Sequence, residues 1–319
     1  MIIATLIAAD RLTQDNLWDV FDALDEIGVQ AHGGGFREPG AIDLMIVERE
    51  DCDLSSWADP PKLPGPEQLR AVQRRWIADI KAAISGAVPR VDVVVQPEKH
   101  RFKRLLLADM DSTMIEVECI DELADYAGVK SQVAAVTERA MRGEIGFEAA
   151  LDARVALLAG LEEAAIDRCR EERVRFTPGA KALVRTMGAR GATCILVSGG
   201  FTRFAGPVAA EIGFDRVIAN ELEIESGRLT GRVKRPIVGA EAKQAALLAA
   251  AEELEIPLAA TMAVGDGAND IPMIEAAGLG LAYHAKLALK AAADAVVDHN
   301  DLTALLYAQG IPRSEWVLD

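Results

Sequence analysis

Two aspartates, Asp109 and Asp111, come directly after the apolar run Leu105–Ala108. The run is short and unbroken, with basic residues before it, and this pattern predicts a buried strand of a parallel sheet. Such a strand delivers the residues that follow it to the carboxyl edge of the sheet, where α/β proteins bind their ligands. Two carboxylates held close together there repel each other, and a hard divalent cation such as Mg²⁺ offsets that repulsion. A solvated strand end is the simpler interpretation, and the rest of the chain decides between the two.

Three later segments supply the other parts of a phosphoryl-transfer site. Ser198 and Gly199 follow the predicted strand 193–197, and the glycine lets the backbone approach an anion closely. Lys243 lies near the start of a predicted helix, where its charge adds to the anion affinity of the helix N-terminus. Each segment alone is also consistent with an ordinary turn or a solvated helix residue, but their order along the chain favours a site. A glycine-rich turn after the predicted strand 258–264 carries oxygen ligands for a metal ion or for the groups around it, namely Asp266, Asn269 and Asp270.

The aspartate pair can divide the chemistry of phosphate-ester hydrolysis between its two members. A carboxylate such as that of Asp109 can accept a phosphoryl group, which splits hydrolysis into two transfers. The carboxyl group of Asp111 can protonate the leaving oxygen and later activate water, which is typically worth ~10²–10⁴-fold in rate. The sequence therefore predicts an enzyme of phosphoryl transfer.

Composition limits the partners and the compartment. The 319 residues carry a net charge of −16, which argues against nucleic acid or an anionic membrane as the main partner. Half of the residues are hydrophobic, which excludes global disorder, but no apolar segment is long enough to span a membrane. Met1–Ala9 lacks the basic region and the cleavage site of a secretory signal. The four cysteines have no C-x-x-C spacing, so we expect reduced thiols in a cytoplasmic protein.

Residues 1–98 predict a separate domain. Their pattern gives the order βαββαβ, which is the ferredoxin-like arrangement and resembles an ACT-type regulatory domain in a degenerate form. A packing or homodimer-forming module without a ligand fits the same order. The acidic, proline-rich segment 52–65 predicts a loop between the third strand and the second helix. The expected elements are a strand at 2–9, a helix at 13–27, two strands within 29–48 of which the second is 42–47, a helix at 66–85 and a strand at 91–96.

Residues 103–319 predict an α/β domain with a Rossmann-like parallel sheet. Strands alternate with helices through 103–116 and 174–319, which requires right-handed crossovers. Between these two parts, residues 117–173 have only helical periodicity, so we expect a helical cap that closes over the site. The remaining expected elements are cap helices at 120–127, 131–142, 147–158 and 162–170, core helices at 180–188 and 242–253, a hairpin at 222–233, and short strands at 279–281 and 295–297.

The four chemical segments, taken in order, resemble the motifs of the haloacid dehalogenase-like phosphohydrolase superfamily, and the resemblance covers about residues 104–297. It implies that Asp109 is the nucleophile and Asp111 the general acid and base. It also implies Mg²⁺ held by the Asp109 side chain, the Asp111 backbone carbonyl and Asp266. Phosphoryl oxygens would then be neutralised by Ser198 and Lys243. Asn269 and Asp270 would order Lys243 and the waters on the metal.

The predicted cap resembles the phosphoserine phosphatase family in residues 115–123, 140–143 and 147–155. This resemblance implies that Glu118 binds the amine of the substrate and that Arg154 binds its carboxylate, for which a guanidinium fork is well suited. Without the resemblance, Arg154 would be interpreted as an exposed helix arginine paired with Asp152 or Glu148. Apolar shielding would come from Met141 and Phe147, and the remaining substrate contacts from Ser198, Gly199 and Asn269.

The resemblance implies a Mg²⁺-dependent phosphatase that converts O-phospho-L-serine into L-serine and phosphate, the last step of serine biosynthesis. A related phosphatase or phosphotransferase for another small phosphorylated metabolite is the main alternative. A phospho-accepting signalling domain and a dehalogenase are disfavoured by Asp111, since neither chemistry needs a second aspartate for proton transfer. We expect a small-molecule substrate and a possible homodimer.

Overall fold

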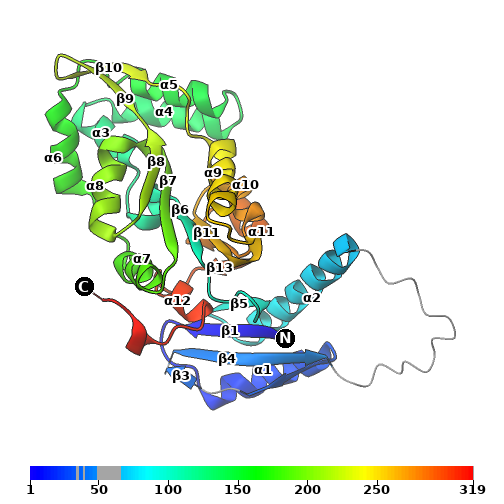
Figure 1. Ribbon diagram of the computed structural model, residues 1–319. Coiled ribbons are helices and arrows are strands. Elements are labelled where there is room, and N and C mark those ends of the chain that lie inside the picture. Colours follow the sequence, from blue (N-terminus) through cyan, green and yellow to red (C-terminus); the bar gives the residue numbers. More distant parts are fainter. Residues whose placement is uncertain (34–35, 39, 49–65, 319) are drawn as a thin grey trace. The chain divides into compact units, whose positions relative to one another are not determined.

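The computed structural model describes residues 1–33, 36–38, 40–48 and 66–318, and for residues 36–38, 48, 66–74 and 141 it describes the backbone alone (Figure 1). The predicted loop 52–65 lies outside these residues. Contacts divide the chain into two compact units. Within the described residues, no helix has both the length and the apolar character needed to cross a membrane. Unit 1 comprises Met1–Phe102, Asp294–Asn300 and Ala304–Ser314, and unit 2 comprises Lys103–Ala293, Asp301–Thr303 and Glu315–Asp319.

Unit 1 contains an antiparallel sheet whose main strands have the order β2-β4-β1-β5, which is the ferredoxin-like topology. One expectation was wrong: residues 29–48 form three strands, because the short β3 folds back on β4. Gly33, with φ +78°, ends β2 in a conformation that favours glycine. The elements are β1 (Ile2–Ala8), α1 (Gln14–Glu26), β2 (Val29–His32), β3 (Phe36–Glu38), β4 (Ala41–Glu48), α2 (Pro66–Ala87), β5 (Val91–Pro97), β13 (Ala295–Val297) and α12 (Ala304–Ala308).

Unit 1 has its own hydrophobic core between the sheet and its two long helices. Helix α1 contributes Leu17, Val20 and Leu24 at helical spacing, and α2 contributes Ile80 and Ile84. The N-terminus of α1 is closed by a capping box, in which the Thr13 and Asn16 side chains satisfy each other's backbone N–H groups.

Unit 2 is built on a parallel sheet in which β6 lies at the centre of the order β12-β11-β6-β7-β8. All four residues of β6 are fully buried, as expected for a central parallel strand. Helices α7 and α8 lie on one side of the sheet, and α9 to α11 lie on the other (Figure 1). The bounds are β6 (Leu105–Ala108), α7 (Ala180–Ala189), β7 (Thr193–Phe201), α8 (Thr202–Ile212), β8 (Arg216–Asn220), α9 (Ala240–Glu253), β11 (Thr261–Gly265), α10 (Ile271–Ala276), β12 (Gly280–Tyr283) and α11 (Leu287–Ala292). The predicted α/β class with a parallel sheet is confirmed.

Two elements of this sheet differ from expectation. The predicted strand 258–264 begins only at Thr261, because Leu258–Ala260 form a 3₁₀ turn after Pro257 in which Ala260 N–H donates to the Pro257 carbonyl. Strand β8 was not predicted; it is short, with Arg216 and Val217 exposed and only Asn220 fully buried.

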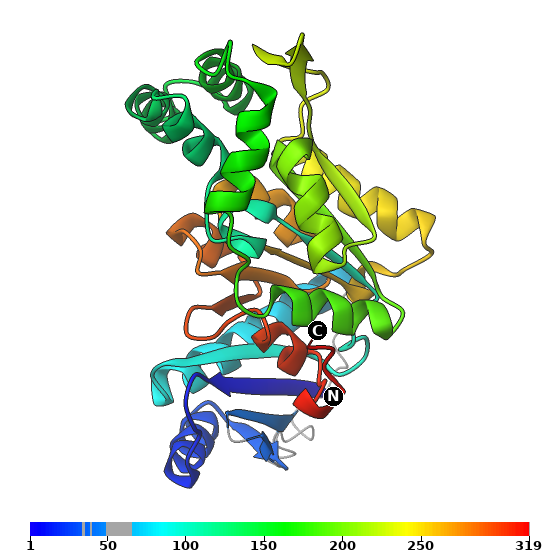
Figure 2. The same ribbon diagram turned by 90° about the vertical axis from the view of Figure 1, so that its left-hand side faces the viewer.

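The cap contains the four expected helices, and a β-hairpin from later in the chain packs against it. Helices α3 (Cys119–Tyr126), α4 (Lys130–Met141), α5 (Phe147–Ala156) and α6 (Glu163–Arg173) gather at one end of unit 2 (Figures 1 and 2). The predicted hairpin, formed by β9 (Leu222–Glu225) and β10 (Arg228–Val233), lies beside them. Backbone hydrogen bonds join Gly160 N–H to Leu229 O and Leu229 N–H to Leu161 O, at 2.8 and 2.9 Å. The hairpin, which belongs in sequence to the core part of the chain, therefore packs against the helical cap.

Candidate active site

Asp109 lies immediately after the buried central strand, at the carboxyl edge of the sheet. Its backbone N–H donates to the Val264 carbonyl, which continues the pairing of β6 with β11 beyond the last strand residue. Its Oδ1 accepts the Met110 N–H at 2.8 Å, and the residue is only 4% exposed. The strand and this local hydrogen bond together fix the carboxylate.

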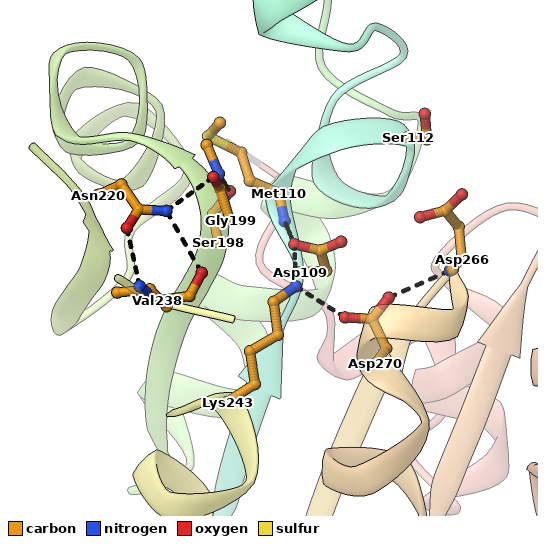
Figure 3. A network of polar contacts seen from close by, with 12 residues as sticks. Asp109, Met110, Ser112, Ser198, Gly199, Asn220, Val238, Lys243, Asp266 and Asp270 are labelled. Carbon is orange, nitrogen blue, oxygen red and sulfur yellow. Dashed lines mark hydrogen bonds and ion pairs between the residues drawn. The ribbon is translucent and has the colours of Figure 1, made fainter. Parts of the chain in front are cut away.

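Lys243 connects the candidate nucleophile to the glycine-rich turn (Figure 3). Its Nζ lies 2.6 Å from Asp109 Oδ1 and 2.7 Å from Asp270 Oδ1, and the lysine is fully buried. Burial alone would lower the pKa of Lys243, but the two carboxylates raise it above its ordinary value. The lysine therefore remains charged and holds two acidic side chains that belong to different motifs.

The turn after β11 is compact because glycine is required beside Asp270. A Cβ on Gly265 would come within 2.4 Å of Asp270 Oδ2, so no side chain fits there. The same oxygen accepts the Gly267 N–H at 3.1 Å. This hydrogen bond shapes the turn that presents Asp266.

Three carboxylates gather at this edge and have the donor chemistry of a divalent metal site. One oxygen from each of Asp109, Asp266 and Asp270 lies within 4.8 Å of the others. Burial and the Asp270 carboxylate raise the pKa of Asp109, against the opposing effect of Lys243, and burial also raises that of Asp266. Lys243, together with the largely exposed Lys286 that lies 3.4 Å from Asp266, neutralises the three carboxylates incompletely, so a bound cation with oxygen ligands fits the arrangement.

Asp111 lies in a distorted turn, Met110–Met114, that follows Asp109. Its Oδ1 is buried and has no hydrogen-bond partner among the described residues. Burial, and then the nearby Glu118 carboxylate, raise the pKa of Asp111 to about 7. A carboxyl group in this environment can carry a proton at neutral pH, as a general acid requires.

Ser198, Gly199 and Gly200 form the end of β7 rather than a turn after it. The Gly200 N–H donates to Ser198 Oγ at 2.8 Å. A Cβ on Gly200 would lie 3.0 Å from Asp111 Oδ2 and 3.1 Å from Ser198 Oγ. The serine hydroxyl and the Asp111 carboxyl group therefore both lie close to Gly200, where a side chain would crowd them.

One cavity of about 500 Å³ brings the predicted site residues together. One wall contains residues at or just after the ends of strands β6, β7 and β11, and the other wall comes from the cap. Lys243 and Asp270 are hydrogen-bonded beneath it and do not line it. The predicted residues that line the cavity are Asp109, Asp111, Glu118, Phe147, Arg154, Ser198, Gly199, Asp266 and Asn269.

The two cap residues predicted to select the substrate differ in how firmly they are held. Glu118 precedes α3, and its Oε1 accepts a hydrogen bond from Ser112 Oγ at 2.9 Å. Arg154 lies in the last turn of α5, half-buried, with its Nε donating to the Ala150 carbonyl. Burial lowers the pKa of Arg154, while nearby carboxylates, Asp121 first, oppose the change.

The simpler interpretation of Arg154 does not agree with the ion pairs of the cap. Asp152 and Glu148, its expected helix partners, lie instead 2.6 and 3.7 Å from Arg235. Arg154 is thus directed to the cavity rather than to a surface pair on its own helix.

Of the two predicted shielding residues, only one has a described side chain. Phe147 is 39% exposed and its ring covers the backbone of two glycines, since a Cβ on Gly199 or on Gly239 would lie 3.3 Å from it. The side chain of Met141 lies outside the described part of the chain.

Sequence reasoning missed two residues near the site. Asn220 ends β8, which was not predicted, and Lys286 follows the short strand β12. The Nζ of Lys286 lies 3.4 Å from Asp266 Oδ2, and the residue lines the cavity. Lys286 follows a strand that was predicted, and its place near the carboxyl edge of the sheet was the available signal.

The comparisons with known proteins agree with this geometry. The family model for haloacid dehalogenase-like hydrolases matches residues 106–275, which include the aspartate pair, the strand end at Ser198, Lys243 and the glycine-rich turn. The chain belongs to the haloacid dehalogenase-like hydrolase family.

Within that family, the chain is similar to several phosphoserine phosphatases. A phosphoserine phosphatase of Archaeoglobus fulgidus is 47% identical over 250 residues, which are 77% of this chain and 72% of that protein. One of Mycobacterium tuberculosis is 46% identical over 80% of this chain, but the matched region spans only 60% of the longer relative. A solved structure described as a phospho-aspartyl intermediate analogue of phosphoserine phosphatase is 38% identical, with a TM-score of 0.61, and covers 65% of this chain and 98% of that one.

Proposed function

We propose that this chain is a Mg²⁺-dependent phosphatase that hydrolyses O-phospho-L-serine to L-serine and phosphate, as the last step of serine biosynthesis. One observation carries the proposal: a single cavity, lined by the buried carboxylates of a phosphoryl-transfer centre with Lys243 paired to Asp109 beneath it, also receives a carboxylate and a guanidinium from the cap. Similarity to phosphoserine phosphatases supports the choice of substrate.

Asp109 is the nucleophile in this proposal. Its carboxylate attacks phosphorus, the bond from phosphorus to the serine oxygen breaks, and Asp111 gives its proton to that oxygen. Lys243 and the Met110 N–H fix the carboxylate through Oδ1, so that little reorganisation is needed for attack. The product of this step is an aspartyl phosphate together with serine.

Asp111 then acts in the opposite direction. As a carboxylate it takes a proton from a water molecule, the water oxygen attacks phosphorus, and the bond to Asp109 breaks. Phosphate leaves, and both aspartates return to their starting states. Ser198 and the neighbouring backbone N–H groups stabilise charge on the phosphoryl oxygens, which is the main requirement of phosphoryl transfer.

The carboxylate cluster suits Mg²⁺, for which Asp109, the Asp111 carbonyl and Asp266 would be ligands, with Asp270 ordering them and Lys243. When bound, the ion supplies positive charge that the acidic cavity lacks. A phosphate dianion entering beside three carboxylates would otherwise be repelled.

Glu118 and Arg154 select phosphoserine by charge. The first faces the amine and the second the carboxylate, while Phe147 excludes water above the phosphate-binding glycines. Both charged groups stand on the cap (residues 117–173), so cap closure would bring them to a substrate held by the core.

Three described cysteines are free and buried, which suits the reducing cytoplasm that we infer for the protein.

A phosphate-release assay on three related esters tests this function. Phosphoserine is compared with phosphoethanolamine, which lacks the carboxylate, and with 3-phosphonooxypropanoate, which lacks the amine, each with Mg²⁺ and with a chelator. We expect phosphoserine to have the highest kcat/KM and all activity to depend on the metal. Equal kcat/KM for the three esters would contradict amino-acid recognition, and a higher value for an unrelated phosphometabolite would favour the alternative substrate class.

A further inference from the structure

The end of β7 contains a bulge that leaves one backbone carbonyl without a strand partner. Pairing between β7 and β8 passes from Ser198 opposite Ala219 to Phe201 opposite Asn220, so Gly199 and Gly200 have no counterparts. Such an interruption of the ladder deprives the extra residues of their usual hydrogen bonds. The Gly199 carbonyl therefore needs a donor from elsewhere.

Asn220 supplies that donor with its side chain (Figure 3). Its Nδ2 donates to the Gly199 carbonyl at 2.8 Å and to the Val238 carbonyl at 3.3 Å, and its Oδ1 accepts the Val238 N–H at 2.7 Å. The residue is 1% exposed, and its two N–H groups and its oxygen all have partners. A buried amide with this many bonds is held in one orientation.

The same peptide group continues to the serine of the candidate site. The Gly199 carbonyl and the Gly200 N–H belong to one peptide, and that N–H donates to Ser198 Oγ. A hydroxyl that accepts a hydrogen bond on one side directs its own hydrogen elsewhere. Ser198 lines the cavity, so the free direction includes the space where a phosphoryl group would lie.

We propose that Asn220 is a positioning residue: by holding the peptide between Gly199 and Gly200, it turns the Ser198 hydroxyl into a hydrogen-bond donor for a phosphoryl oxygen. The inference rests on the proposed function, in which Ser198 binds that oxygen. Asn220 touches neither substrate nor reacting atoms and acts through Ser198.

The second pair of bonds made by Asn220, to Val238, reaches the segment that precedes helix α9. Val238 precedes Gly239, whose carbonyl accepts the Lys243 N–H at 3.0 Å at the start of α9. One amide thus ties the strand end that carries Ser198 to the segment leading into the helix that carries Lys243.

A double-mutant cycle in the full-length protein tests the proposal. Asn220→Ala, Ser198→Ala and the double variant are compared by kcat/KM for phosphoserine and by calorimetric titration with inorganic phosphate in Mg²⁺. Asn220→Leu, which keeps the side-chain volume without polar atoms, is measured beside Asn220→Ala in case the smaller residue prevents folding. Thr261→Val is the matched control, since Thr261 is a fully buried polar residue with bonds to Leu258 and Gly278 away from the cavity.

We expect Asn220→Ala to lower kcat/KM and the affinity for phosphate roughly 10–100-fold, because buried carbonyl and N–H groups lose their partners. In the Ser198→Ala background the same change should cost less than about 3-fold, since coupled residues are not additive. Thr261→Val should lower Tm and leave both readouts unchanged.

If the fold-losses of Asn220→Ala and Ser198→Ala simply multiply in the double variant, the positioning role is overturned and Asn220 is a merely structural residue. Failure of the unaltered protein to hydrolyse phosphoserine would contradict the proposed function instead. The phosphate titration would then still decide whether Asn220 acts through Ser198.

Discussion

Asp92 in unit 1 and Asp109 in unit 2 are both buried carboxylates, at 3% and 4% exposure, but their surroundings are opposite. Asp92 accepts N–H hydrogen bonds from Asp298, His299 and Asn300 at 2.9 to 3.2 Å, and one from Asn300 Nδ2 at 2.7 Å. Four N–H groups of its own unit therefore donate to this carboxylate.

Asp109 has no such surplus of donors. It shares one lysine with Asp270, and burial together with that second carboxylate raises its pKa. A folded-state pKa above the unfolded value means that the ionised form of Asp109 costs stability at neutral pH. Buried charge therefore does not distinguish a functional site from a structural anchor, whereas incomplete compensation of that charge does.

The substitution Asp109→Asn is the strongest test of this comparison between Asp92 and Asp109. We expect turnover of phosphoserine to fall roughly 10³-fold or more, because an amide cannot form the aspartyl phosphate. Tm measured in a chelator should be unchanged or higher, since the substitution removes a poorly compensated buried charge. Phosphate release and thermal unfolding of the same preparation check both parts. Substantial turnover would contradict the covalent mechanism, and a large drop in Tm would contradict the electrostatic comparison.

Removal of the metal should have the next largest effect. A chelator is expected to lower kcat roughly 10²–10³-fold, because a bound cation is worth several kcal/mol of charge stabilisation. Mg²⁺ should also raise Tm of the unaltered protein, since it binds only the folded carboxylate cluster. The metal-induced rise should be smaller in Asp266→Asn. An equal rise in the two proteins would mean that the ion binds elsewhere.

Asp92→Ala probes the other side of the comparison. Loss of the carboxylate leaves several buried N–H groups without an acceptor, which should cost about 2–4 kcal/mol of unfolding free energy. Denaturant unfolding measures that loss, and kcat determined well below the transition should remain that of the unaltered protein. A proportional fall in kcat would show that unit 1 influences the chemistry.

The site could be predicted from sequence wherever its parts are adjacent in the chain or follow an apolar strand. Asp109, Ser198 and Asp266 all come at or near the ends of buried strands, and parallel topology brings such ends together. Asn220 could not be found in this way, because its role depends on a two-residue bulge that sets the register between β7 and β8. The contact of the hairpin with the cap was missed for a similar reason: residues far apart in sequence, Leu229 and Leu161, make it through backbone groups.

The smallest expected effect concerns the cap rather than the buried carboxylates of the core. Arg154→Ala should lower kcat/KM for phosphoserine by about one to two decades, since charge-assisted bonds to a carboxylate are worth roughly 1.5–3 kcal/mol. The value for phosphoethanolamine, which has no carboxylate, should change little.

Arg168→Ala is the matched control for that change, because Arg168 is an exposed arginine on cap helix α6. Steady-state kinetics on both esters, with all three proteins at one Mg²⁺ concentration, give the comparison. Parallel losses on the two esters in Arg154→Ala would make Arg154 a structural residue of α5. A loss confined to phosphoserine would mean that the cap contributes selectivity while the core, with its poorly compensated carboxylates, contributes the chemistry.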